Sequence, residues 1–116
     1  MSGAAGMGRV LEGKVAIVAG ATRGAGNGIA IELGAAGAKT YCLGRTLRPG
    51  TGERSGSLEE TVAQIEALGG QAVPIACDAS DDAVLAEVFA RVWRDEGRLD
   101  VLVNSVFSAG SLGPHI

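Results

Sequence analysis

Apolar runs alternate along the chain with amphipathic segments, and this alternation predicts the order of the secondary structure. Four short runs predict strands: Val15–Ala19, Thr40–Leu43, Ala72–Ala76 and Leu99–Val103. The first run is continuously apolar, as is typical of a strand that is buried on both faces. Between the runs, apolar residues recur three or four positions apart, which is the spacing of helices with one buried face. The predicted order is therefore β-α-β-α-β-α-β.

Capping residues mark where two of the predicted helices begin. Ser57, followed three positions later by Glu60, has the pattern of a capping box. We expect the apolar stripe of that helix to end at Leu68. Ser80 or Asp81 is expected to cap the last helix. The stripe of the last helix is predicted to lie in the core and consists of the pairs Val84/Leu85, Val88/Phe89 and Val92/Trp93.

Pro74 lies inside the third predicted strand and helps to place it. Proline cannot donate a ladder hydrogen bond, so this strand is expected at an edge of the sheet. Strands that alternate with helices imply a parallel sheet with right-handed crossovers, and doubly wound folds begin with the strand order 3-2-1-4. The predicted fold class is therefore α/β, a Rossmann-like doubly wound parallel sheet that is truncated after the fourth strand.

Length and composition exclude several other classes of protein. The chain has 116 residues, of which 47% are hydrophobic and 20% charged, a balance typical of one globular domain rather than of a disordered chain. A net charge of -3 argues against a nucleic-acid partner. No apolar run approaches the roughly 20 residues of a membrane span, and no signal peptide is evident. We therefore expect a cytoplasmic protein without membrane or nucleic-acid partners.

Cysteine and histidine are too scarce for metal or disulfide chemistry. The two cysteines, Cys42 and Cys77, are too few for a disulfide framework or a zinc site, and the single histidine is His115. We interpret both cysteines as small buried thiols of the core. No metal site is predicted.

The most informative segment is the glycine-rich turn between the first strand and the first helix. It includes Gly20, Thr22, Arg23, Gly24, Ala25 and Gly26. Glycines at these positions would allow a tight turn, a close approach of a ligand to the backbone, and close packing of the helix on the sheet. The amide groups of the first helical turn have no partner within the helix and attract a pyrophosphate. We predict dinucleotide binding here, with an ordinary strand–helix turn as the alternative.

Arg45 follows the second strand, where dinucleotide-binding folds recognise the adenosine ribose. An acidic residue at this place would accept hydrogen bonds from the 2′-hydroxyl of NAD(H), whereas arginine pairs with the 2′-phosphate of NADP(H). Positions 43 to 47 contain no acidic residue. The sequence thus favours NADP(H), with NAD(H) as the alternative cofactor and a solvated loop arginine as the alternative for Arg45.

Asp78 and Asn104 follow the third and fourth strands, at the side of the sheet where ligands bind. Asp78 is predicted to accept a hydrogen bond from the adenine amino group, or else to act as a loop or capping carboxylate. Asn104 is predicted to contact the ribose, or else to tie its strand to a neighbour.

These motifs resemble the short-chain dehydrogenase/reductase family. The segment from Ala19 to Gly26 is similar to the family's Thr-Gly-x-x-x-Gly-x-Gly cofactor loop. Cys77-Asp78 resembles the family's adenine-contacting pair, and Asp100 to Asn104 resembles its Asp-x-Leu-Val-Asn strand. The resemblance implies an NAD(P)-dependent oxidoreductase of alcohols or carbonyl compounds, and Arg45 resembles the family's NADP-preferring branch.

Two parts of the sequence depart from the family pattern. Ala19 replaces the threonine whose hydroxyl braces the turn in relatives, and Ser105-Val106-Phe107 replaces Asn-Ala-Gly after Asn104. Some family members carry an aromatic residue at the position of Phe107. In the family, the catalytic serine follows a fifth strand and the Tyr-x-x-x-Lys pair lies on a later helix, whereas this sequence stops after the fourth predicted strand. Its single tyrosine is Tyr41, in the second strand. No catalytic residue is therefore predicted.

The expected domains are a flexible lead-in at residues 1–12, an NAD(P)-binding Rossmann half-domain at 13–107 and a C-terminal tail at 108–116. On this interpretation the chain would act on a carbonyl or alcohol substrate only if the missing half were supplied. The alternative is a non-catalytic nucleotide-binding or interaction module that self-associates through its exposed fourth strand. A flavodoxin-like or receiver domain is disfavoured, because the first strand ends in glycines rather than in an acidic cluster.

Overall fold

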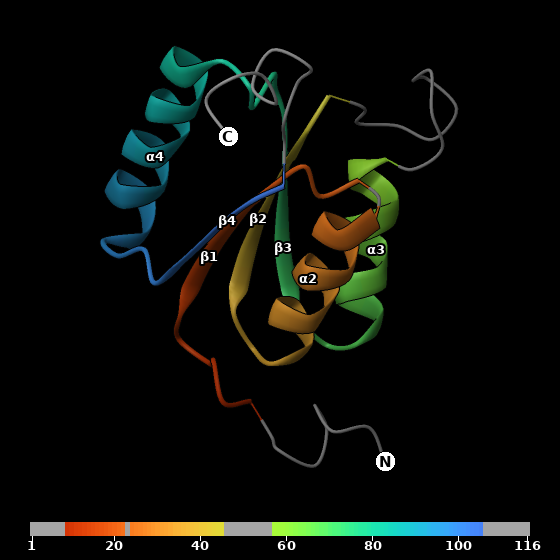
Figure 1. Cartoon of the computed structure of the whole chain (residues 1–116). Helices are drawn as coiled ribbons and strands as arrows, with labels where there is room; N and C mark the ends of the chain where they lie inside the picture. Colours follow the sequence, from red (N-terminus) through yellow and green to blue (C-terminus); the bar gives the residue numbers. More distant parts are fainter. Residues whose placement is uncertain (1–8, 23, 46–56, 106–116) are drawn as a thin grey trace.

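The fold consists of four strands and three helices that alternate along the chain (Figure 1). A computed structural model describes residues 9–22, 24–45 and 57–105, so the predictions for Arg23, Val106 and Phe107 lie outside the described residues. The elements are β1 (Val15–Ala19), α2 (Gly24–Ala35), β2 (Lys39–Gly44), α3 (Leu58–Ala67), β3 (Gln71–Ala76), α4 (Asp82–Glu96) and β4 (Val101–Asn104). The predicted element order is confirmed.

All strand pairs of the sheet are parallel, and the strand order is β3-β2-β1-β4. Ile17 in the central strand β1 is paired with Tyr41 on one side and Leu102 on the other. Pro74 is paired with Cys42, and its own strand β3 forms one edge of the sheet. The Rossmann-like fold class and the edge position that Pro74 predicted are both confirmed.

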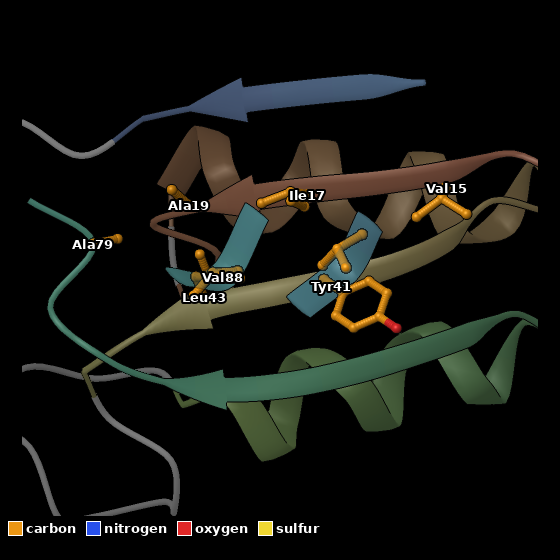
Figure 2. Close-up of a cluster of buried hydrophobic side chains, with 8 residues drawn as sticks. Val15, Ile17, Ala19, Tyr41, Leu43, Ala79 and Val88 are labelled. Carbon is orange, nitrogen blue, oxygen red and sulfur yellow. The ribbon is translucent and has the colours of Figure 1, made fainter. Parts of the chain in front are cut away.

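Helices cover both faces of the sheet, with α2 and α3 on one side and α4 on the other (Figure 1). All five residues of β1 are buried, as its continuously apolar sequence predicted. Alternate residues face the two sides, so Val18 and Cys42 pack in the cluster beneath α2 and α3. Ile17 and Tyr41 pack with Val88 of α4 in the opposite cluster (Figure 2).

Two apolar side chains that the sequence placed in buried stripes are exposed. Trp93 is 62% exposed, because α4 turns its Val88 and Val92 face toward the sheet and Trp93 lies a further 100° or so around the helix. Leu68 is 52% exposed, because α3 ends at Ala67 and the chain turns away at this position. Both predictions were wrong, and each error concerns the margin of a stripe rather than its centre.

The helix caps follow their predicted side chains. The Ser57 hydroxyl accepts a hydrogen bond from the Glu60 amide at 3.2 Å, which fixes the start of α3. Of the two candidate caps for α4, Asp81 is the cap, since its carboxylate accepts hydrogen bonds from the amides of Ala83 and Val84.

The two cysteines differ in burial, and both are free thiols. Cys42 is fully buried as predicted, and this burial raises its thiol pKa to about 12. Cys77 is only partly buried at the margin of the α4 cluster.

Candidate cofactor-binding site

The predicted site residues lie where the strands end, at one edge of the sheet. Gly20 follows β1, Arg45 follows β2, and Asn104 is the last residue of β4. Ala19 and Asn104 are direct partners in the ladder, as are Gly44 and Ala76. The carboxyl ends of all four strands therefore meet at this edge, which is where ligands bind in doubly wound sheets.

The turn between β1 and α2 requires glycine at two positions for reasons of backbone conformation. Gly20 has a φ of 80° and Gly24 a φ of 61°, values in the left-handed region that other residues rarely adopt. A Cβ atom at Gly24 would have no atom within 4 Å. Gly24 therefore supplies conformation and leaves open space beside the backbone.

Gly26 is required for a different reason, which is the closeness of the helix to the turn. A Cβ atom at this position would lie 2.0 Å from the carbonyl oxygen of Gly20 and 2.4 Å from the Ser105 hydroxyl. Only glycine allows α2 to approach the end of β1 this closely. The role predicted for Gly26, close packing of helix on sheet, agrees with this geometry.

The first turn of α2 faces this edge with its amide groups. The amides at the start of a helix have no partner within the helix and form the positive end of its dipole. Gly24 and Ala25 are exposed, and the first turn of α2 contains no acidic residue. An anionic group such as a pyrophosphate fits the positive potential and the open space beside Gly24.

Thr22 connects the turn to the end of β2. A Cβ atom at Gly44 would lie 2.8 Å from the Thr22 methyl carbon, so the Thr22 side chain packs directly against the backbone of Gly44. The next residue along the chain is Arg45. The candidate pyrophosphate and 2′-phosphate contacts therefore come from adjacent parts of the same edge.

Arg45 and Asp78 form an exposed ion pair. The Arg45 Nη2 and Asp78 Oδ1 atoms are 3.4 Å apart, and the side chains are 75% and 50% exposed. Hydrogen bonds from the hydroxyl and amide of Ser80, together with the Arg45 charge, hold the pKa of Asp78 below its usual value. Asp78 is therefore an anionic acceptor, while most of the Arg45 side chain is exposed to solvent.

Asn104 is the remaining predicted residue, and it lies at the end of β4 beside Ala19. Its side chain is exposed. The structure thus brings Asn104 to the same edge as the glycine turn.

Three residues whose role at the turn the sequence did not predict hold the turn in place. Ser105 donates its hydroxyl proton toward the carbonyl oxygens of Ala19 and Gly20, at 3.0 and 3.2 Å. Thr61 of α3 donates to the carbonyl of Ala21 at 2.9 Å and accepts from Asn27 at 2.8 Å. The sequence carried one signal for Thr61, a polar residue within the apolar stripe of α3 between Leu58 and Ile65.

Metal chemistry has no support in residues 9–22, 24–45 and 57–105, which contain no group of three His, Cys, Asp or Glu side chains able to hold an ion. In the same part of the chain, no helix is long and apolar enough to cross a membrane.

Comparison with known proteins identifies the family. The family model described as short chain dehydrogenase matches residues 14–112. Dehydrogenase/reductase SDR family member 1 of Mus musculus is 40% identical over 99 residues, which are 84% of this chain and 29% of the mouse protein. The chain therefore spans less than a third of the length of that relative.

Solved structures of short-chain oxidoreductases and dehydrogenases also match this chain. A metagenomic short-chain oxidoreductase (SDR) in complex with NADP matches with a TM-score of 0.70 and 36% identity, covering 80% of this chain and 38% of that one. Carveol dehydrogenase from Mycobacterium avium in complex with NAD matches with a TM-score of 0.69 and 26% identity, covering 85% and 37%. This chain belongs to the short-chain dehydrogenase/reductase family.

Proposed function

We propose that this chain is the NADP(H)-binding portion of an oxidoreductase that acts on alcohol or carbonyl substrates. The observation that carries the proposal is the glycine turn at the carboxyl edge of the sheet. There, Gly26 lets α2 pack against the Gly20 carbonyl more closely than a residue with a Cβ atom would allow. When bound, the cofactor supplies or accepts a hydride, and the residues of this chain bind and orient it.

In this proposal the pyrophosphate of the cofactor is bound by the amide groups of Gly24, Ala25 and Gly26. Thr22 and Arg23 are proposed to contact the same phosphates. Two features support this placement: the left-handed backbone of Gly24, which leaves open space beside it, and the absence of an acidic residue from the first turn of α2.

The preference for NADP(H) over NAD(H) is assigned to Arg45. The Arg45 side chain is 75% exposed at the end of β2, where its guanidinium can pair with a 2′-phosphate. Asp78 is proposed to accept a hydrogen bond from the adenine amino group, and its lowered pKa keeps the carboxylate charged. Asn104 is proposed to contact the ribose from the end of β4.

No residue of this chain is proposed to be catalytic. Its single tyrosine, Tyr41, lies 3% exposed beneath α4 and donates a hydrogen bond to Glu96. Burial and this bond raise its pKa to about 12, opposite to what a proton-transferring phenol requires. Alcohol or carbonyl substrates therefore enter the proposal only together with the rest of a full-length relative.

A second candidate function is association with another chain through the edge strand β4, and one observation favours it. Strand β4 is an edge strand without proline, and its Leu102 is 49% exposed. Unpaired edges with apolar residues pair readily with further strands. Sedimentation of the chain over a range of concentrations tests this candidate, and Leu102→Lys is expected to abolish any self-association.

The test of NADP(H) binding compares two charge-reversal variants by calorimetry. The unaltered chain is expected to bind NADPH at least tenfold more tightly than NADH. Arg45→Asp should remove or invert this preference, because a carboxylate repels the 2′-phosphate. Arg94→Asp makes the same change of charge on an exposed part of α4 and should leave the preference intact. Equal affinities for NADPH and NADH in the unaltered chain would overturn the assignment of Arg45.

A further inference from the structure

The carbonyl groups of the cofactor turn are bonded by side chains from two separate elements. Ser105, directly after β4, donates toward the oxygens of Ala19 and Gly20. Thr61, one turn inside α3, donates to the oxygen of Ala21 at 2.9 Å. Three successive carbonyls therefore face hydroxyl donors that lie far away in the sequence, and the single Ser105 proton is shared between the Ala19 and Gly20 oxygens.

The amide groups at the start of the same turn are also bonded within the protein. The amides of Gly20 and Ala21 both donate to the carbonyl of Leu43, at 2.9 and 3.0 Å. Thr61 is fully buried, and its hydroxyl also accepts a hydrogen bond from Asn27 of α2. The backbone from Ala19 to Ala21 is thus fixed by β2, α3 and the end of β4 before the helix begins.

We propose that Ser105 and Thr61 are positioning residues for the cofactor pyrophosphate. Carbonyl oxygens repel phosphate, so a turn that binds phosphate must direct these oxygens elsewhere and present amides instead. Ser105 and Thr61 hold the oxygens of residues 19–21 on protein donors. This fixes where the first amides of α2 point. The inference rests on the proposed cofactor binding and adds the residues that determine its strength.

The location of Ser105 strengthens the assignment. Its hydroxyl would be 2.4 Å from a Cβ atom at Gly26, so it lies in the narrow contact between β1, β4 and the start of α2. Its backbone amide also donates to the Ala19 oxygen at 3.0 Å. Loss of the hydroxyl would leave this strand contact in place while releasing the Gly20 carbonyl. The expected effect is therefore on the turn rather than on the sheet.

The experiment measures the affinity of four variants for two probes, NADPH and 2′-AMP. Ser105→Ala and Thr61→Val remove the hydroxyls, whereas Thr61→Ser keeps one. Thr40→Val is the matched control. The Thr40 hydroxyl is also buried and also donates to a backbone carbonyl, that of Ala38. Thr40 lies near the start of β2 rather than at the cofactor turn. 2′-AMP carries the 2′-phosphate but no pyrophosphate, so it reports on the Arg45 region alone.

Ser105→Ala and Thr61→Val are each expected to weaken NADPH binding by about two- to tenfold, the usual worth of one hydrogen bond. Their affinity for 2′-AMP should not change. Thr61→Ser and Thr40→Val should bind NADPH like the unaltered chain. Unchanged NADPH affinity in both hydroxyl-free variants, or an equal loss for 2′-AMP, would overturn the inference. Failure of the unaltered chain to bind NADPH or NADH would instead overturn the proposed function.

Discussion

The two ends of the sheet use their charged side chains differently. At the end where the strands begin, Asp100 accepts hydrogen bonds from Arg98 at 2.8 Å and from the Val15 amide at 2.9 Å. Lys39 and Glu96 form an ion pair there at 2.7 Å. At the opposite end, where the strands finish, Arg45 and Asp78 are 3.4 Å apart and largely exposed.

We therefore expect the charged residues at the amino end to contribute to folding stability and those at the carboxyl end to contribute to cofactor binding. Short, multiply bonded charges at the amino end join α4 and β4 to the central strands. Loosely paired charges at the carboxyl end contribute little to the free energy of unfolding, but they can exchange partners with a ligand. Variants at the amino end should therefore lower stability without changing cofactor affinity, and variants at the carboxyl end should do the reverse.

The largest expected effect is at Gly26, where the two properties are coupled. Gly26→Ala places a Cβ atom 2.0 Å from the Gly20 oxygen, so helix and turn must move apart. The amides of the turn would be displaced from the pyrophosphate and more than one hydrogen bond would weaken, so calorimetry should show NADPH affinity falling by about tenfold or more.

Gly28→Ala is the control for this variant. It lies on the same helix, and its Cβ atom would have no atom within 4 Å. This change should preserve NADPH binding and stabilise the protein by up to about 1 kcal/mol. NADPH affinity in Gly26→Ala equal to that of Gly28→Ala would contradict the close approach of helix and turn.

The next effect is on acid stability, through Asp100. Arg98 and the Val15 amide lower the pKa of this carboxyl to about 2 in the folded protein, below its value of about 3.9 in unfolded chains. The charged carboxylate therefore stabilises the fold above pH 4, and this contribution is lost as the pH falls toward 2.

Thermal melts from pH 7 to pH 2 check this dependence. Asp100→Asn should melt lower than the unaltered chain at pH 7, and the difference should shrink steadily below pH 4. A constant difference across the pH range would argue against the role of Asp100.

A smaller loss of stability is expected at Tyr41. Tyr41→Phe removes the hydrogen bond to Glu96 but leaves the Lys39–Glu96 ion pair, so chemical denaturation should show a loss of about 1 kcal/mol. NADPH affinity should stay the same, because Tyr41 packs under α4 at the amino end. A change in affinity comparable to that of Arg45→Asp would erase the distinction between the two ends.

The smallest effect on stability is expected for Asp78→Asn at the carboxyl end. Its partner Arg45 is mostly solvated, and the amide oxygen of asparagine can still accept the hydrogen bonds from Ser80. The melting temperature should therefore stay within error of the unaltered chain. A clear drop in melting temperature would show that the exposed pair contributes to the fold.

The order of elements and strands could be predicted because each rests on local pattern. The apolar run of β1, the caps Ser57 and Asp81, and Pro74 at the edge all follow from residues close together in the sequence. Trp93 could not be placed in the same way. Its exposure depends on which way α4 rolls on the sheet, and that is decided by contacts of Val88 and Val92 with distant strands.

The location of the candidate site could be predicted from the same kind of local pattern. Glycine spacing and strand ends located Gly20, Gly26, Arg45 and Asp78 at one edge. The roles of Ser105 and Thr61 were missed because their partners are carbonyls of the turn, which lie 40 to 86 positions away in the sequence. The place of Thr61 within an apolar stripe was a local signal, but it did not identify the partner.

The most direct test is an NMR titration of the isotopically labelled chain with NADPH, read at the backbone amides. The amides of Gly24, Ala25 and Gly26 should show the largest saturable shifts, because they are proposed to donate to the pyrophosphate. Amides near Arg98 at the opposite end should stay unchanged. Saturable binding with its largest shifts away from the glycine turn, or no binding, would contradict the account.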